Sequence, residues 1–363
     1  MTAVSEPLSA AAAATPVRVF IDLTHLGRHV TGIERVSIEQ FEKVDFDQAN
    51  VTPVRSSGTL SLIFKQQIWL PLLALLHPNA MFVFPGFPPS PLIVFARSRV
   101  IWYVHDLFLI TRRAELGRRA KLYMAAPFAF AVKRLLNFQV NSQKTADELA
   151  PFAPAGAKIS LYRPSVANVF ALDPAGRAER PAHPKPLKIA TLGTVEPRKN
   201  YAAALPILDA LTALGHPGAQ LHIIGREGWG EAKDALNNHP RVTIHGYLSA
   251  DRVKALLEDA DLYLCTSHDE GLGLPLLEAQ YAGLSVIAPD KTVFREVLGD
   301  SAILIDAAKP LEAATKIAQS MCVPDWRARS TAAALANVIR WNGLASGDAA
   351  NARQIFAQSA LSH

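Results

Sequence analysis

The second half of the chain alternates short apolar runs with longer stretches in which apolar residues recur every three or four positions. Continuous runs of Val, Ile and Leu predict strands that are buried on both faces, and the periodic stretches predict helices between them. We expect strands at 187–193, 220–225, 242–246, 261–266, 285–289 and 302–306. This alternation predicts a parallel sheet covered by helices on both faces, which is a doubly wound domain.

The first half shows the same rhythm less regularly. Its apolar runs predict strands at 17–23, 81–85, 99–106, 138–142 and 158–162. Because 363 residues exceed the usual size of a single core, two domains are expected. We therefore predict an α/β protein with two Rossmann-like domains, at 17–165 and 187–325.

The segments outside these two domains have a different character. Residues 166–186 are rich in Pro and have no apolar period, so they indicate a linker. Residues 1–16 are rich in Ala and Ser and carry no basic residue, which argues for a disordered tail and against a secretory signal. Residues 326–363 predict helices that cross back to the first domain.

Cysteine content bears on the compartment. The two cysteines, Cys265 and Cys322, are far apart and lack metal-ligand spacing, which argues against a disulfide and against a Cys-based zinc site. This cysteine usage indicates a reducing compartment, so we expect a cytoplasmic protein.

The net charge of +5 hides an asymmetry between the halves. Up to residue 170 there are 18 Lys and Arg against 11 Asp and Glu, and beyond it 19 against 21. Seven of the basic residues lie at 112–134, a region that is predicted as a long helix and also carries Tyr123, Phe128 and Phe130. A solvated basic face explains this pattern, and so does contact with anionic lipid headgroups or a diphosphate-bearing acceptor. No nucleic-acid-binding module is present in the sequence.

The longest apolar stretch lies at 60–77. Lys65, Gln66, Gln67 and Pro71 interrupt it, so we expect it to be too broken to span a bilayer, although it can lie against one.

The segment 269–279, DEGLGLPLLEA, carries two carboxylates around a glycine-proline turn. It follows an apolar run, so strand, loop and helix are expected in that order. Glu270 then lies in the loop and Glu278 about one helical turn after Pro275, and both can face one crevice. Backbone N–H groups of Gly273 and Leu274 can hold an anion there. A helix that begins with Glu because its dipole favours acids explains the pattern equally well.

The segment 193–200, GTVEPRKN, follows the first strand of the second half. Asn200 is expected to cap a helix, which places Arg198 and Lys199 at its N-terminus. The helix dipole disfavours cations there, unless an anion such as a phosphate lies between them. Extension of both side chains into water is the alternative.

Two candidates lie in the first half. Gly32, in HVTGIER, permits close approach of a ligand to the backbone. His105 ends an apolar strand and is expected to point towards the crevice at the strand's carboxyl end. The alternative is an interior, hydrogen-bonded His105 followed by an Asp106 that caps a turn.

The order of TGIER, VHDL, NSQKTADEL, LGTVEPRKN, IIGREGWG and the long segment that contains DEGLGLPLLEA resembles GT-B glycosyltransferases of family 4. The resemblance is closest to the bacterial mannosyltransferase-like branch of surface polysaccharide synthesis. It implies two Rossmann-like domains that face a central cleft, the second binding a nucleotide-sugar donor and the first an acceptor. It also implies retention of anomeric configuration without a metal or other cofactor, and GDP-mannose as the donor. The acceptor it implies is a lipid-linked glycan or an oligosaccharide, at the inner face of the cell membrane.

The resemblance assigns roles to the candidates. Glu270 contacts hydroxyls of the donor sugar and Glu278 the ribose, while Lys199 neutralises the leaving diphosphate. Gly32 approaches that diphosphate from the opposite domain, and His105 contacts the sugar. The base pocket lies near Tyr247 and Leu248, and Gly273, Leu274 and Pro275 form the anion cradle.

One departure from the family pattern concerns the diphosphate. Many members carry an Arg about five residues before the Lys, where this chain has Gly193 and Thr194. Arg198 is the candidate to replace it. Two other functions stay open, namely transfer from a UDP- or dTDP-sugar and a non-catalytic scaffold that binds a nucleotide sugar.

Overall fold

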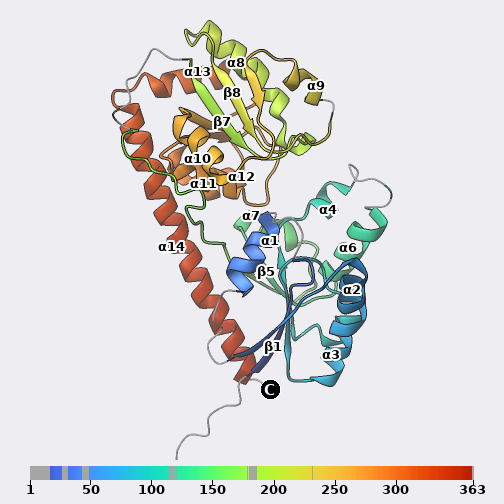
Figure 1. Ribbon diagram of the computed structural model, residues 1–363. Coiled ribbons are helices and arrows are strands. Elements are labelled where there is room, and N and C mark those ends of the chain that lie inside the picture. Colours follow the sequence, from blue (N-terminus) through green and yellow to red (C-terminus); the bar gives the residue numbers. More distant parts are fainter. Residues whose placement is uncertain are drawn as a thin grey trace, which may run out of the picture.

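The computed structural model describes residues 17–26, 32–42, 49–113, 118, 121–177, 179, 186–230 and 232–361. The tail expected at 1–16 and most of the second half of the linker lie outside these residues. The described chain forms two six-stranded parallel sheets, each flanked by helices, as Figure 1 shows. The predicted α/β fold with two Rossmann-like domains is confirmed.

The first sheet has the strand order β2-β1-β3-β4-β5-β6. Its strands are β1 (Val17–Asp22), β2 (Ala49–Val54), β3 (Met81–Phe84), β4 (Val100–Val104), β5 (Asn137–Val140) and β6 (Lys158–Leu161). The sequence prediction missed β2, because the run contains Pro53 and little apolar character. An edge strand tolerates a proline, since the missing N–H can face away from the sheet, and β2 lies at the edge.

The second sheet has the order β12-β11-β10-β7-β8-β9. Its strands are β7 (Lys188–Leu192), β8 (Gln220–Ile224), β9 (Val242–Ile244), β10 (Leu262–Leu264), β11 (Ser285–Pro289) and β12 (Ala302–Ile305). Each lies within one of the six predicted runs. The order reverses between β7 and β10, and ligands in doubly wound sheets bind beyond the carboxyl ends of strands at such a point.

Helical elements connect the strands. Those of the first half are α1 (Gly32–Ser37), η1 (Ile38–Glu42), α2 (Thr59–Phe64), η2 (Lys65–Trp69), α3 (Leu70–Leu76), η3 (Pro91–Ala96), α4 (Phe108–Thr111), η5 (Lys121–Ala125), α6 (Ala126–Val132) and α7 (Gln143–Leu149). Those of the second half are η6 (Pro197–Lys199), η7 (Tyr201–Ala203), α8 (Ala204–Ala213), α9 (Ala232–Asn237), α10 (Ala250–Asp259), α11 (Leu274–Gln280), α12 (Thr292–Leu298), η8 (Gly299–Ser301), α13 (Pro310–Met321) and α14 (Trp326–Leu361).

One expectation about the apolar stretch at 60–77 was wrong. The polar residues at 65–67 do not break the apolar stretch, because η2 carries them within a continuous helix from α2 to α3. By length and composition this helix, Thr59–Leu76, could cross a membrane. Of the long helix expected across 112–134, the structure places 121–132 as helix, and α4 ends before it at Thr111. Residues 114–117, 119 and 120 lie outside the described residues.

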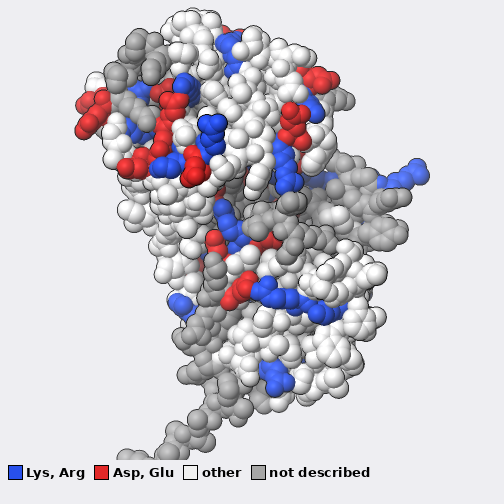
Figure 2. Space-filling model, viewed as in Figure 1, with Lys and Arg blue, Asp and Glu red and all other residues white. Residues whose placement is uncertain are grey.

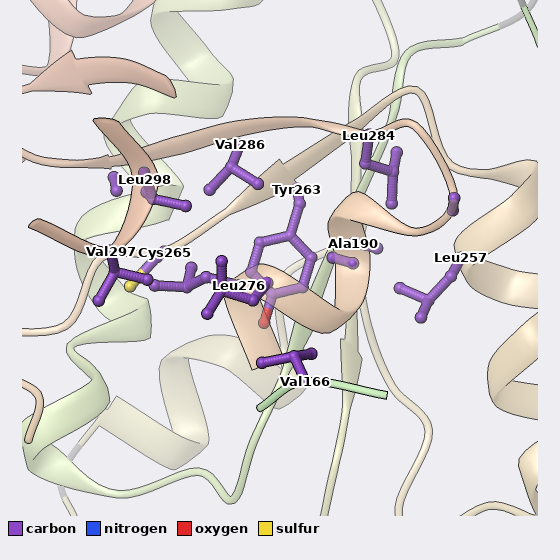
Figure 3. Packing of buried hydrophobic residues seen from close by; sticks show 14 of the residues in the cluster. Val166, Ala190, Leu257, Tyr263, Cys265, Leu276, Leu284, Val286, Val297 and Leu298 are labelled. Carbon is purple, nitrogen blue, oxygen red and sulfur yellow. The ribbon is translucent and has the colours of Figure 1, made fainter. Parts of the chain in front are cut away.

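The core of the second domain packs around the ring of Tyr263, on β10. Figure 3 shows this ring surrounded by aliphatic side chains from the strands and helices, including Leu276 and Val286. Its buried hydroxyl accepts a hydrogen bond from the Leu192 N–H at 3.0 Å, which satisfies the polar atom. This packing fixes the ends of β7 and β10 relative to each other.

Helix α14 runs along one side of both domains (Figure 1). Near its middle, Trp341 is fully buried and donates from Nε1 to the Pro164 carbonyl at 2.9 Å. Further along, Asp348 accepts from Arg163 at 2.9 Å, and Ala352 packs into the core of the first domain beside β1 and β3. The helix therefore ties the two domains together on the side away from the cavities described below.

Candidate functional site

Glu270 lies in the loop after β10 and is almost fully buried. Its Oε1 accepts from Lys199 Nζ and from Ser267 Oγ, each at 2.7 Å, and its Oε2 accepts from Arg198 Nη1 at 2.6 Å. Burial alone raises the pKa of this carboxyl group, but the two cations outweigh burial and hold the pKa below its usual value. Glu270 is therefore an ionised carboxylate inside a cage of donors.

The two cations come from the turn after β7, across the reversal point of the sheet. Arg198 and Lys199 belong to η6, and α8 begins only at Ala204. The prediction that Asn200 caps a helix was wrong, because its side chain makes no capping hydrogen bond. Asn200 instead adopts a left-handed conformation with φ of 50° between two short turns. The cations are therefore not at the N-terminus of an α-helix, and Glu270 supplies their counter-ion. Arg198 is also paired with Glu196 at 2.8 Å.

Glu278 lies one turn into α11. This helix begins with Leu274 and Pro275, and Gly273, with φ of 89°, directly precedes it. The Glu278 carboxylate is buried and pairs with the guanidinium of Arg35, from α1 of the first domain. Burial raises the pKa of Glu278, and Arg35 offsets this effect only in part. The two glutamates thus face different partners, which come from different domains.

The sequence reasoning missed Arg35. Arg35 lies in the motif HVTGIER, in which glycine is the usual sign of close backbone approach and an arginine carries no comparable signal. Gly32 begins α1 and is exposed, and among the described residues a Cβ atom there would meet nothing within 4 Å. The structure gives no steric reason for glycine at this position.

His105 follows β4, and its Nε2 lies 2.7 Å from the Pro85 carbonyl oxygen. Because a carbonyl only accepts, Nε2 carries the proton and Nδ1 of the neutral ring is an acceptor. Burial lowers the pKa of His105 to about 4, so the ring is neutral at pH 7. Asp106 accepts from the Phe108 N–H at 3.0 Å, as the capping alternative predicts.

The loop that carries Glu270 contacts the first domain directly. Ser142 Oγ donates to the Gly271 carbonyl at 3.0 Å, and Lys144 Nζ donates to the Glu270 carbonyl at 3.2 Å and pairs with Asp269 at 2.8 Å. A Cβ atom on Gly271 would lie 2.6 Å from the His105 carbonyl oxygen, closer than real Cβ contacts allow. Glycine at 271 thus permits the His105 and Glu270 loops to touch.

Two cavities border these residues. A space of about 10 Å³ is lined by Lys199, Glu270, Gly273, Pro275 and their neighbours. A larger cavity of about 850 Å³ lies between the domains, with Phe108 and Arg112 on one side and Arg198 and Trp229 on the other. Arg198 stands at the edge between the two, stacked over the Phe108 ring at 5.4 Å.

The residues predicted for the base pocket lie elsewhere. Tyr247 follows β9 and is exposed, and Arg226 lies over its ring at 5.7 Å. Leu248 packs against the core of the second domain. Neither is among the residues that line the two cavities.

Comparison with known proteins supports the resemblance to glycosyltransferases that the sequence motifs indicate. Residues 174–334 match the model of a family described as glycosyl transferases group 1. The O-antigen chain mannosyltransferase B of Escherichia coli is 30% identical over 152 residues, which cover 40% of this chain and 39% of that protein. The chain spans less than half the length of the curated relatives that it matches first.

Solved structures share the fold at low identity. A sucrose-phosphate synthase from Thermosynechococcus elongatus superimposes with a TM-score of 0.67 and 15% identity, over 94% of this chain and 100% of that one. The Anabaena protein HepE, solved with UDP and glucose, gives a TM-score of 0.64 and 15% identity over 96% and 100% of the two chains. The predicted resemblance is thereby confirmed: the chain has the GT-B fold, and its residues 174–334 match the glycosyl transferases group 1 family.

Proposed function

We propose that the protein is a retaining, metal-independent hexosyltransferase that moves a sugar from a nucleotide sugar onto a glycan acceptor. The single observation that carries the proposal is the cage around Glu270, in which Lys199 Nζ and Arg198 Nη1 lie 2.7 and 2.6 Å from the carboxylate. The cage lies at the reversal point between β7 and β10, where doubly wound sheets bind ligands.

The cage provides the two things that sugar transfer needs from this domain. Lys199 and Arg198 are positive charges held in place before the reaction, and a leaving diphosphate is stabilised by such charges without a metal. When the diphosphate takes up the cations, the Glu270 carboxylate becomes the acceptor for hydroxyl groups of the donor sugar. By resemblance to the family, the acceptor attacks on the face from which the diphosphate leaves, and a donor phosphate oxygen takes its proton.

The opposite domain contributes Arg35 and His105. Arg35 is a cation 243 positions from Glu278 in sequence but paired with it in space. Its Nε is buried and has no acceptor among the described residues, so one donor of the guanidinium is available for a phosphate oxygen. We assign to Arg35 a third positive charge at the diphosphate, beside Lys199 and Arg198.

In this assignment a ribose hydroxyl takes the place of Arg35 on Glu278. His105 presents its unprotonated Nδ1 as an acceptor for a hydroxyl of the sugar, because Nε2 is committed to Pro85. The contact of Gly271 with the His105 loop then brings both domains onto one donor.

GDP-mannose is the first candidate donor, since the name of the Escherichia coli relative is O-antigen chain mannosyltransferase B. The same name supports a role in O-antigen or other polysaccharide synthesis. By resemblance to the family, we propose a lipid-linked acceptor at the cytoplasmic face of the membrane. A UDP-sugar is the second candidate, because HepE was solved with UDP and glucose.

A binding panel tests the proposal. The melting temperature of the purified protein is measured with GDP-mannose and with UDP-, dTDP- and ADP-sugars, each with and without Mg²⁺. We expect one base to raise the melting temperature by several degrees without Mg²⁺. No shift with any nucleotide sugar would contradict the proposal, and a shift that requires Mg²⁺ would contradict its metal-independent form.

Transfer itself is measured by release of the nucleoside diphosphate in the presence of lipid-linked glycan acceptors. The Glu270→Gln variant separates an enzyme from a scaffold. We expect it to bind the nucleoside diphosphate but not to release it from the donor. Equal release of the nucleoside diphosphate by the wild type and by Glu270→Gln would contradict the assignment of Glu270 to the active site.

A further inference from the structure

Exposed apolar side chains concentrate on one surface of the first domain. Of the 22 large hydrophobic residues exposed among the described residues, 12 lie on the helix from α2 to α3 and on η3, η5 and α6 beside it. We call this surface the apolar face: Leu60, Ile63, Phe64, Ile68, Trp69, Leu72, Leu75, Leu76, Leu92, Phe95, Met124 and Phe130. The elements are contiguous, since η3 packs against η2, α3 and α6.

The helix from α2 to α3 exposes more apolar side chains than an ordinary surface helix does. Leu70, Leu73 and Ala74 face inward and are buried in the core of the first domain. On the other side, Leu60, Leu75 and Leu76 are 84%, 63% and 61% exposed, at positions where an amphipathic helix carries polar residues. A patch of this kind marks a surface with a partner.

The charges around the apolar face identify the kind of partner. Residues 59–134 contain ten Lys and Arg but only two Asp and Glu. Arg97, Lys133 and Arg134 are exposed, and Arg134 lies 5.7 Å from the centroid of the Phe130 ring. In Figure 2 the surface over α3 is mostly uncharged, with a band of Lys and Arg above it. Apolar side chains bordered by cations are typical of proteins that lie on an anionic bilayer.

We propose that the apolar face docks on the surface of an anionic lipid bilayer, with α2 to α3 lying in the plane of the headgroups. The buried residues of the same helix hold it against the sheet, so it lies on the membrane and does not cross it. This is a specific form of the membrane contact that the basic region at 112–134 already suggested.

The docking surface is connected to the cleft. Helix α4 packs against η5 and α6 at one end of the apolar face, and its residues Phe108 and Leu109 line the large cavity between the domains together with Arg112. An acceptor anchored in the bilayer therefore reaches that cavity along α4. This last step rests on the proposed function, whereas docking itself does not.

Vesicle flotation with the full-length protein tests the docking. The vesicles are pure phosphatidylcholine, or phosphatidylcholine with 30% phosphatidylglycerol. The apolar variant is Phe64→Gln/Ile68→Gln/Leu75→Gln, and the charge variant is Arg97→Gln/Lys133→Gln/Arg134→Gln. The matched control removes exposed apolar residues elsewhere, Leu311→Gln/Ile339→Gln/Leu344→Gln.

We expect the wild type and the control to float with the anionic vesicles. The apolar variant should bind them at least tenfold more weakly. Each basic residue near an anionic leaflet strengthens binding about fivefold, so the charge variant should lose roughly 100-fold. Failure of the wild type to float, or equal binding by the apolar variant and the control, would overturn the proposal.

Two further measurements separate the alternatives. Light scattering without vesicles shows whether the apolar face joins two copies of the chain, and a dimer that only the apolar variant loses would also overturn docking on lipid. Nucleotide-sugar binding, measured as a shift in melting temperature, should be the same in all four proteins. If docking holds but no protein binds a nucleotide sugar, the proposed function fails alone.

Discussion

Glu270 and Glu278 are separated by eight positions on one loop and helix, yet the structure holds their carboxylates in different ways. Glu270 has three donors, all from its own domain, and its pKa lies below the usual value. Among the described residues, Glu278 pairs with a single cation, Arg35, which comes from the other domain, and the pKa of Glu278 lies above the usual value. Burial is similar at both sites, so the number and origin of the cations make the difference.

This difference bears on how the site responds to domain motion. The cage around Glu270 is built on β7 and β10, which pack on one core, so it persists if the domains separate. The pair between Glu278 and Arg35 exists only while the domains are in contact. Glu270 therefore belongs to the permanent part of the proposed site, and Glu278 to the part that closure completes.

The largest expected effect is on transfer by Glu270→Gln. Loss of the carboxylate charge leaves Lys199 and Arg198 without their counter-ion and removes the acceptor for the sugar hydroxyls. We expect turnover to fall by about 10²-fold or more, with affinity for the nucleoside diphosphate within threefold of the wild type. Steady-state kinetics and calorimetry measure the two quantities.

Glu196→Gln is the matched control, because Glu196 is the other carboxylate that pairs with Arg198. It should lower turnover by less than tenfold. If the two variants lose turnover equally, turnover depends on the pairing of Arg198 with a carboxylate and not on the position of Glu270 beside the donor sugar.

The second largest expected effect is the loss of nucleotide affinity in Glu278→Gln. A hydrogen bond to a charged group contributes about 1.5–3 kcal/mol, so loss of the charge should weaken binding of the nucleoside diphosphate roughly 10–100-fold. Turnover at saturating donor should change by less than tenfold. If the variant binds the nucleotide as tightly as the wild type, Glu278 does not bind the ribose.

Arg35→Gln sharpens the comparison by separating nucleoside from diphosphate. If Arg35 contacts the diphosphate, the variant should lose about tenfold in affinity for the nucleoside diphosphate while affinity for the matching nucleoside stays within threefold. Arg35→Lys, which keeps the charge, should recover part of the loss. Equal losses for both ligands would mean that Arg35 acts only through the shape of the domain contact.

Gly271→Ala tests the dependence on closure. The added Cβ atom lies 2.6 Å from the His105 carbonyl oxygen, so the two loops must move apart. We expect about a tenfold loss of turnover, nucleotide affinity within threefold, and a larger radius of gyration in X-ray scattering. Gly343→Ala on α14 is the control, since an added Cβ there meets nothing within 4 Å. A compact and fully active Gly271→Ala variant would show that the contact does not limit the reaction.

The sequence predicted the cage more fully than it predicted the closure. The carboxylate and both cations lie in short motifs directly after strands with strong apolar patterns, so their meeting at one sheet edge follows from topology. The cap at Asn200 failed because a left-handed residue and two short turns precede α8 there. Arg35 could not be predicted as the partner of Glu278, because the contact depends on how two independently folded domains face each other. The edge strand β2 was missed because Pro53 removes the usual strand pattern.

The smallest expected effect is the pH dependence of stability, which should have opposite signs at the two glutamates. The lowered pKa of Glu270 means that its stabilisation is present above pH 4.5 and is lost as the pH falls through the folded-state pKa. The raised pKa of Glu278 means that its contribution is present below pH 4.5 and is lost as the pH rises through the folded-state pKa. Glutamine imitates the protonated group in each case. The melting temperature of Glu270→Gln should therefore fall relative to the wild type as the pH rises from about 3 to 5. That of Glu278→Gln should rise relative to the wild type as the pH rises from about 4.5 to 7.5. The same sign in both variants would mean that Arg35 neutralises Glu278 as completely as Lys199 and Arg198 neutralise Glu270.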